Sequence, residues 1–69
     1  MPVFRVETAG VTIWTGTFET ADVTNIPAEY LERPADPAAG EPYPPAHNLF
    51  IDDTLIGVQI CLAQEAAGV

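Results

Sequence analysis

Three side chains between residues 47 and 53 have the chemistry of metal ligands, because the imidazole of His47 precedes the adjacent carboxylates of Asp52 and Asp53. Adjacent residues of a strand point to opposite faces, so these two carboxylates can share an ion only if they lie in a turn. Turn formation by Asp and a solvated histidine explain the same pattern. We therefore expect that the chain holds no metal ion and no other cofactor.

A thiol and an imidazole are the other reactive pair, since Cys61 is the single cysteine and His47 the single histidine. A catalytic thiolate needs an adjacent base or a positive field. Cys61 stands instead between Ile60 and Leu62, where a free cysteine usually behaves as a small buried hydrophobic residue. The chain also contains no Ser and no Lys, which excludes serine nucleophiles, Schiff bases and lysine-bearing phosphate loops. We expect that the protein is not an enzyme.

Two further patterns have a simple structural explanation. Glu29 and Glu32 lie three residues apart and would share one helix face, as an acid–base pair does, but the outer face of any surface helix shows the same spacing. Residues 34–37 and 42–45 have the PxxP spacing of polyproline ligands. Because that spacing arises by chance in any proline-rich stretch, we interpret the segment as a linker or arm.

The charge balance indicates which partners the chain avoids. Ten carboxylates stand against two arginines, for a formal net charge of −8. Phosphate backbones and anionic membrane surfaces are bound through clusters of Lys and Arg, so we expect neither nucleic acid nor membrane as a partner. Residues 54–64 form an uncharged run that is far shorter than the ~20 apolar residues of a transmembrane helix. No signal-peptide pattern is present at the N-terminus, so we expect a cytoplasmic protein, or a virion protein if the source is a virus.

The elements that must position these side chains begin with a β-hairpin. Residues 3–8 alternate in polarity, and residues 11–18 are rich in β-branched and aromatic residues. A two-residue loop at positions 9 and 10 pairs residues whose numbers sum to 19, which places Arg5 directly opposite Trp14. The predicted core face of this hairpin consists of Phe4, Val6, Val11 and Ile13.

A short helix and a long arm follow the first hairpin. Asn25 can cap a helix over residues 25–32, and Pro27 suits its first turn. Residues 33–47 contain five of the seven prolines, a density that no interior helix or strand tolerates. This arm is therefore predicted to be extended, mobile in the free protein and ordered on a partner.

The chain closes with a second predicted hairpin, residues 48–51 and 54–63, around Asp52 and Asp53, and then with a frayed tail over residues 64–69. The last strand is apolar on both faces, and the chain has few elements to cover it. We find no internal repeat, because the two hairpins differ in turn residues and spacing.

These elements predict a mainly β protein of one small domain spanning residues 1–69. Its expected architecture is a small antiparallel sheet or partly closed barrel of about four strands, arranged as two hairpins, with one short helix and a proline-rich extended arm. A domain of this length buries a modest core and has no disulfide to stabilise it, so contact with a partner is expected.

Large aromatic residues and arginine dominate the energetics of protein interfaces, and they are the candidate contact residues here. Arg5 and Trp14 are expected to form an exposed cation–π pair on the second face of the hairpin, and Tyr43 to anchor the arm. The candidate interface residues are Arg5, Trp14, Tyr30, Tyr43 and Phe50.

The sequence therefore predicts a non-enzymatic structural or assembly module. We expect a small acidic accessory or decoration-type subunit that oligomerises or docks on a larger protein complex, such as a virion or a multi-subunit assembly. The alternative is an acidic inhibitor that covers the basic, nucleic-acid-binding surface of another protein. The carboxylates are spread along the whole chain, as is typical of general solubilisation, and this favours the assembly module.

Overall fold

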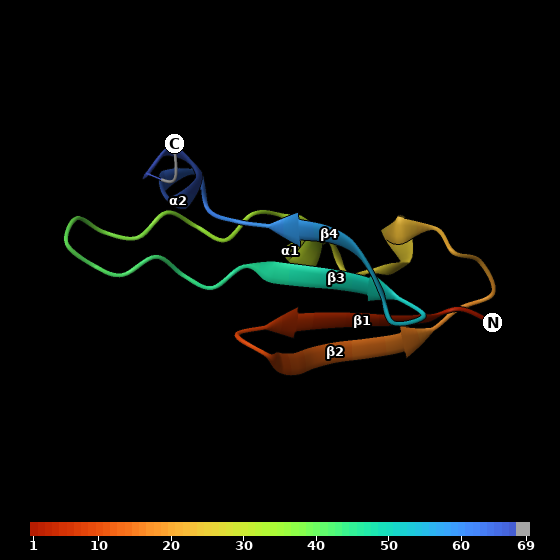
Figure 1. Cartoon of the computed structure of the whole chain (residues 1–69). Helices are drawn as coiled ribbons and strands as arrows, with labels where there is room; N and C mark the ends of the chain where they lie inside the picture. Colours follow the sequence, from red (N-terminus) through yellow and green to blue (C-terminus); the bar gives the residue numbers. More distant parts are fainter. Residues whose placement is uncertain (68–69) are drawn as a thin grey trace.

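The computed structural model describes residues 1–67 and contains one four-stranded antiparallel sheet made of two hairpins (Figure 1). The strands are β1 (Val3–Thr8), β2 (Val11–Thr17), β3 (His47–Ile51) and β4 (Thr54–Gln59). Their order in the sheet is β2-β1-β3-β4. The mainly β class and the two hairpins are thus confirmed, and the sheet is open rather than closed into a barrel.

Both hairpins turn through two residues in the left-handed region of backbone space. The φ angles are 51° at Ala9 and 79° at Gly10, and 48° at Asp52 and 65° at Asp53. Two successive positive φ angles give a turn whose twist matches that of the flanking strands. Gly and Asp tolerate this conformation, whereas Ala9 adopts it against the preference of its Cβ atom.

A β-bulge in the second strand of the first hairpin changes the expected register. Thr8 pairs with Val11 as predicted, but the ladder shifts at Ile13, and Val6 pairs with Trp14. The predicted pairing of Arg5 with Trp14 is wrong for this reason, since the extra residue moves every later side chain of β2 to the other face. Arg5 pairs with Thr15 instead.

The second hairpin contains the same irregularity. Its ladder shifts between Leu49 and Phe50, and the extra residue opposite this shift is Ile56. Ile56 is the third residue after the turn of the second hairpin, and Ile13 is the third residue after the turn of the first. Val6 pairs with Leu49 at the centre of the sheet, where the hairpins are related by an approximate two-fold axis. A residue of the first hairpin is therefore equivalent to the residue 43 positions later in the second hairpin, as Val6 is to Leu49. The sequence shows no repeat, yet the two hairpins share one geometry.

One face of the sheet, the covered face, packs against the segment between the hairpins. This segment contains the 3-10 turn η1 (Val23–Asn25) and the helix α1 (Ala28–Leu31), and Figure 1 shows α1 behind the sheet. The ring of Phe18 meets that of Phe4 edge-on at 5.4 Å between centroids. The buried core consists of Phe4, Val6, Ile26 and Leu49, with Trp14, Phe18, Tyr30, Leu31 and Ile51 packed around it.

The predicted helix over residues 25–32 is shorter than expected: α1 covers only Ala28–Leu31, and Asn25 ends the preceding turn η1. Asp22, not Asn25, caps the first turn, because its carboxylate accepts hydrogen bonds from the amide (2.9 Å) and the hydroxyl (2.8 Å) of Thr24. The Asn25 amide reaches back to the carbonyl oxygen of Thr20 at 3.0 Å. Pro27 then begins a single turn of α-helix that lacks a side-chain cap.

The proline-rich arm runs out beyond the sheet and returns (Figure 1), in a molecule with principal extents of 43 × 19 × 19 Å. Its first part contacts the helix α2 (Leu62–Ala67): Asp36 accepts a hydrogen bond from the Ala63 amide at 3.1 Å, and Arg33 forms an ion pair with Glu65. The last strand ends at Gln59, shorter than predicted, and α2 replaces the first part of the predicted frayed tail. Residues 68–69 of that tail lie outside the described residues.

Candidate interaction surface

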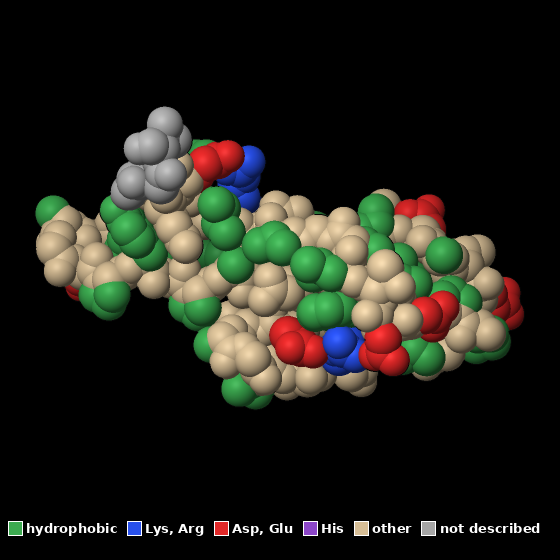
Figure 2. Space-filling model, in the orientation of Figure 1, with side chains coloured by type: hydrophobic (Ala, Val, Ile, Leu, Met, Phe, Trp, Pro, Cys, Tyr) green, Lys and Arg blue, Asp and Glu red, His purple; other side chains and the backbone are tan. Residues whose placement is uncertain are grey.

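The second face of the sheet, which we call the open face, carries apolar side chains that no other element within residues 1–67 covers. Residues paired across strands share a face, so the register places Phe50, Leu55 and Val58 together, and we call these three residues the apolar half. Leu55 is 52% exposed and Val58 49%. Figure 2 shows hydrophobic side chains gathered over β3 and β4, beside a cation flanked by carboxylates.

The neighbouring hairpin makes most of the rest of the open face polar. At the positions equivalent to Leu55 and Val58 under the local two-fold axis stand Thr12 and Thr15. Both threonines are exposed. Apart from Val3, which is 48% exposed beside Arg5 and Thr15, the open face divides into an apolar half on β3 and β4 and a polar half on β1 and β2.

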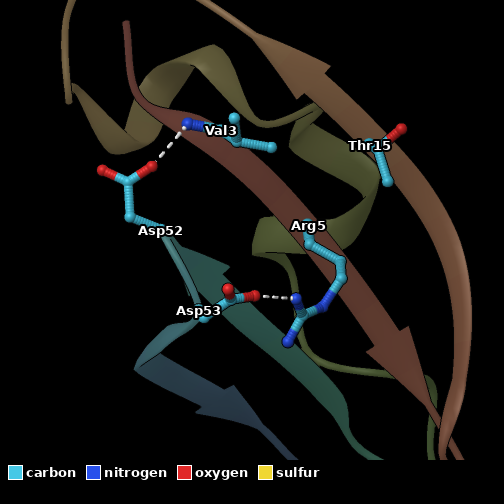
Figure 3. A pocket seen from close by; sticks show the side chains of 5 residues that line it. All are labelled: Val3, Arg5, Thr15, Asp52 and Asp53. Carbon is cyan, nitrogen blue, oxygen red and sulfur yellow. Dashed lines mark hydrogen bonds and ion pairs between the residues drawn. The ribbon is translucent and has the colours of Figure 1, made fainter.

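Arg5 lies at the boundary of these halves and forms ion pairs with two carboxylates of its own chain. Its guanidinium donates to Oδ1 of Asp53 at 2.5 Å (Figure 3). Its Nε atom is 2.6 Å from Oε2 of Glu7. The guanidinium carbon lies 4.2 Å from the centroid of the Phe50 ring. The hydrogen bond to Asp53, with Glu7 nearby, raises the pKa of Arg5, so this group keeps its charge at every accessible pH.

Asp52 joins the second turn to the start of β1. Its Oδ1 atom accepts from the Val3 amide at 2.9 Å, and its own amide donates to the Val3 carbonyl at 2.9 Å (Figure 3). A hollow of about 290 Å³ lies between these residues, Arg5 and Thr15. Because its one cation is already paired with carboxylates of the same chain, the hollow is unsuited to an anionic ligand.

The candidate interface residues fall into three groups. Arg5 and Phe50 lie on the open face, as paired neighbours of β1 and β3. Trp14 and Tyr30 lie on the covered face, with their rings 6.5 Å apart. Tyr43 is 48% exposed on the arm. The bulge at Ile13 explains the position of Trp14. Leu55 and Val58 are not among the residues that the sequence predicts for the interface, and Val58 shares a face with Leu55 only because of the second bulge.

The residues with reactive chemistry remain separate. His47 begins β3 and Asp52 follows its end, so the extended strand holds them about 16 Å apart at 3.3 Å per residue. His47 packs edge-on against the Tyr30 ring at 5.9 Å between centroids. Cys61 is buried, and its sulfur accepts from the Gln64 amide at 3.3 Å. Within residues 1–67, no group of three His, Cys, Asp or Glu side chains converges as metal ligands would.

Most carboxylates act within the fold. Six of the ten serve as caps, turn contacts or ion-pair partners: Glu7, Asp22, Asp36, Asp52, Asp53 and Glu65. They are distributed over both hairpins, the cap of η1, the arm and α2, rather than collected on one face. The acidic composition is thus used largely for local structure.

The two edge strands are poor templates for a further strand. β2 and β4 are the edges of the sheet, and each contains a bulge, at Ile13 and at Ile56. A bulge twists an edge and interrupts its row of hydrogen-bonding groups, which protects natural sheets from edge-to-edge pairing. The open face is therefore a better contact surface than the edges.

No protein-family model matches this chain, and neither the curated proteins nor the solved structures include a significant match. In the part of the chain that the structure describes, no helix is both long and apolar enough to cross a membrane.

Proposed function

We propose that this protein is a non-enzymatic structural or assembly module. It would serve as a small acidic accessory or decoration-type subunit that docks on a larger protein complex, such as a virion or a multi-subunit assembly, with the open face of its sheet as the contact surface. The observation that carries this proposal is the exposure of Leu55 and Val58 beside Phe50 on a face that nothing else within residues 1–67 covers.

The physical reason is the cost of leaving apolar surface in water. Burial of apolar area is favourable by about 25 cal/mol per Å², so a partner that covers Leu55 and Val58 gains free energy without any reactive group. Phe50 is held by the guanidinium of Arg5, which gives a partner a preformed surface. The surrounding threonines and ion pairs form a polar rim, as at many protein interfaces.

The alternative, an acidic inhibitor of a basic surface, has weaker support. Such an inhibitor presents its carboxylates together on the contact face. Here the six engaged carboxylates are spread over caps, turns and ion pairs, and Glu29 and Glu32 lie on or beside α1, away from the open face. The apolar half therefore supports an assembly role better than a purely electrostatic one.

Site-specific photo-crosslinking in the native source tests the proposal. A photoreactive side chain at position 55 probes the apolar half, and the same group at Glu29, exposed on α1, is the control. We expect a discrete crosslinked protein from position 55 and none from position 29. Crosslinks from position 29 alone, or none from position 55, contradict the proposed function.

A further inference from the structure

Both arginines of the chain are already occupied by its own carboxylates. Arg5 is held by Glu7 and Asp53, and Arg33 by Glu65. Since the chain has no lysine, it has no other strong cation in its side chains to offer a partner. With both arginines paired, the excess charge of the chain is negative, and the Asp53 side chain, which is 87% exposed, presents part of it beside the open face.

These carboxylates border the apolar half directly. The Arg5 guanidinium that stacks on Phe50 is the same group that Glu7 and Asp53 hold, so both carboxylates stand next to the exposed apolar surface. A cation at the edge of a partner that covers Phe50 and Leu55 would come within reach of Asp53. Paired charges at the rim of an interface speed association and reject partners of the wrong sign.

A second copy of this chain fits that arrangement poorly. Each copy has a net charge of −8, and a face-to-face contact would bring the carboxylates around Arg5 close to those of the other copy. Like charges at an interface cost free energy, and neither copy has an uncommitted arginine to compensate.

Building on the proposed function, we propose that the occupant of the apolar half is a different protein, whose contact surface is apolar at its centre and carries Lys or Arg at its edge. The centre covers Phe50, Leu55 and Val58, and the edge cations approach Asp53 and Glu7. The apolar contact supplies the affinity, and the charges select the partner and orient it.

Two synthetic amphipathic helical peptides test this inference, one with a Leu face and a Lys face, the other with the same Leu face and a Glu face. Amide chemical shifts of the isotope-labelled full chain report where each peptide binds. We expect the Leu/Lys peptide to shift β3 and β4 and to bind at least about tenfold more tightly than the Leu/Glu peptide. Leu55→Thr should weaken the affinity for the Leu/Lys peptide about tenfold. Thr12→Leu, the matched change at the equivalent position, should leave that affinity within about twofold of wild type.

Three results overturn the inference. They are equal binding of the two peptides, binding of neither, or shifts confined to α1 and the arm. Sedimentation of the free chain is a fourth test. If the chain forms a concentration-dependent dimer that Leu55→Thr abolishes, the occupant of the apolar half is a second copy. Each of these rejects the cationic partner and leaves the proposed function standing, whereas failure of crosslinking at position 55 rejects the proposed function itself.

Discussion

The guanidinium of Arg5 in β1 stacks on the ring of Phe50, its paired neighbour in β3, with 4.2 Å between the guanidinium carbon and the ring centroid. This contact crosses the central ladder of the sheet, so it joins the two hairpins on the open face as the buried core joins them on the other. A cation over an aromatic face at a partly exposed site stabilises by about 0.5–1 kcal/mol.

A double-mutant cycle measures that contact. Arg5→Ala, Phe50→Ala and the double variant should show a coupling of about 0.5–1 kcal/mol in the free energy of unfolding, obtained from urea denaturation. A cycle of Arg5 with Trp14 provides the comparison and should show no coupling, because the bulge places the two side chains on opposite faces. Coupling to Trp14 and none to Phe50 would indicate the regular register without the bulge.

Trp14→Ala should act on stability rather than on a contact surface. Trp14 stacks on Phe18 with ring centroids 6.2 Å apart and packs on the core. Truncation of such a side chain removes apolar contact and leaves a cavity, which costs about 2–4 kcal/mol. Because this is the single tryptophan, circular dichroism is the appropriate probe of unfolding. If Trp14→Ala leaves the unfolding free energy unchanged but abolishes partner binding, Trp14 belongs to the interface and not to the core.

Gly16 should be intolerant of a side chain, because the rings of Trp14 and Phe18 lie against its backbone. A Cβ atom at Gly16 would stand 2.8 Å from Phe18 Cε2 and 2.9 Å from Trp14 Cζ2. Gly16→Ala is expected to lower the free energy of unfolding by about 1–3 kcal/mol, since both packed rings must move. Gly57→Ala is the control, as its Cβ would meet Leu49 Cδ1 at an ordinary 3.6 Å. Equal effects of the two substitutions would contradict the packing described here.

The Asp22 cap makes a predictable contribution to acid stability. Hydrogen bonds from the Thr24 amide and hydroxyl lower the pKa of Asp22. The stabilisation is thus present above the unfolded pKa of about 3.9 and is lost as pH falls through the folded value. Asp22→Asn retains an acceptor oxygen without the charge, so the stability difference between wild type and variant should shrink below about pH 4. A difference that is constant or grows on acidification contradicts this cap.

The sequence predicts the two hairpins because alternation and turn-forming residues are local signals. It does not reveal the bulges at Ile13 and Ile56, since each lies within a run of residues that suits either face of a strand. The false pairing of Arg5 with Trp14 follows from the first bulge, and the second bulge brings Val58 onto the same face as Leu55. The cap of α2 by Asp36 is equally hidden, because 27 residues separate donor and acceptor.

The role of the open face can be measured as the affinity of the crosslinked partner for three forms of the protein. Wild type, Leu55→Thr and Thr12→Leu are compared by calorimetry at low and high ionic strength. We expect Leu55→Thr to weaken binding about tenfold or more and Thr12→Leu to leave it nearly unchanged. Salt should reduce the affinity only modestly, because apolar burial persists when charges are screened. If Leu55→Thr has no effect, while high salt or replacement of both Glu29 and Glu32 by Gln abolishes binding, the open face is not the contact surface and the electrostatic inhibitor is the better description.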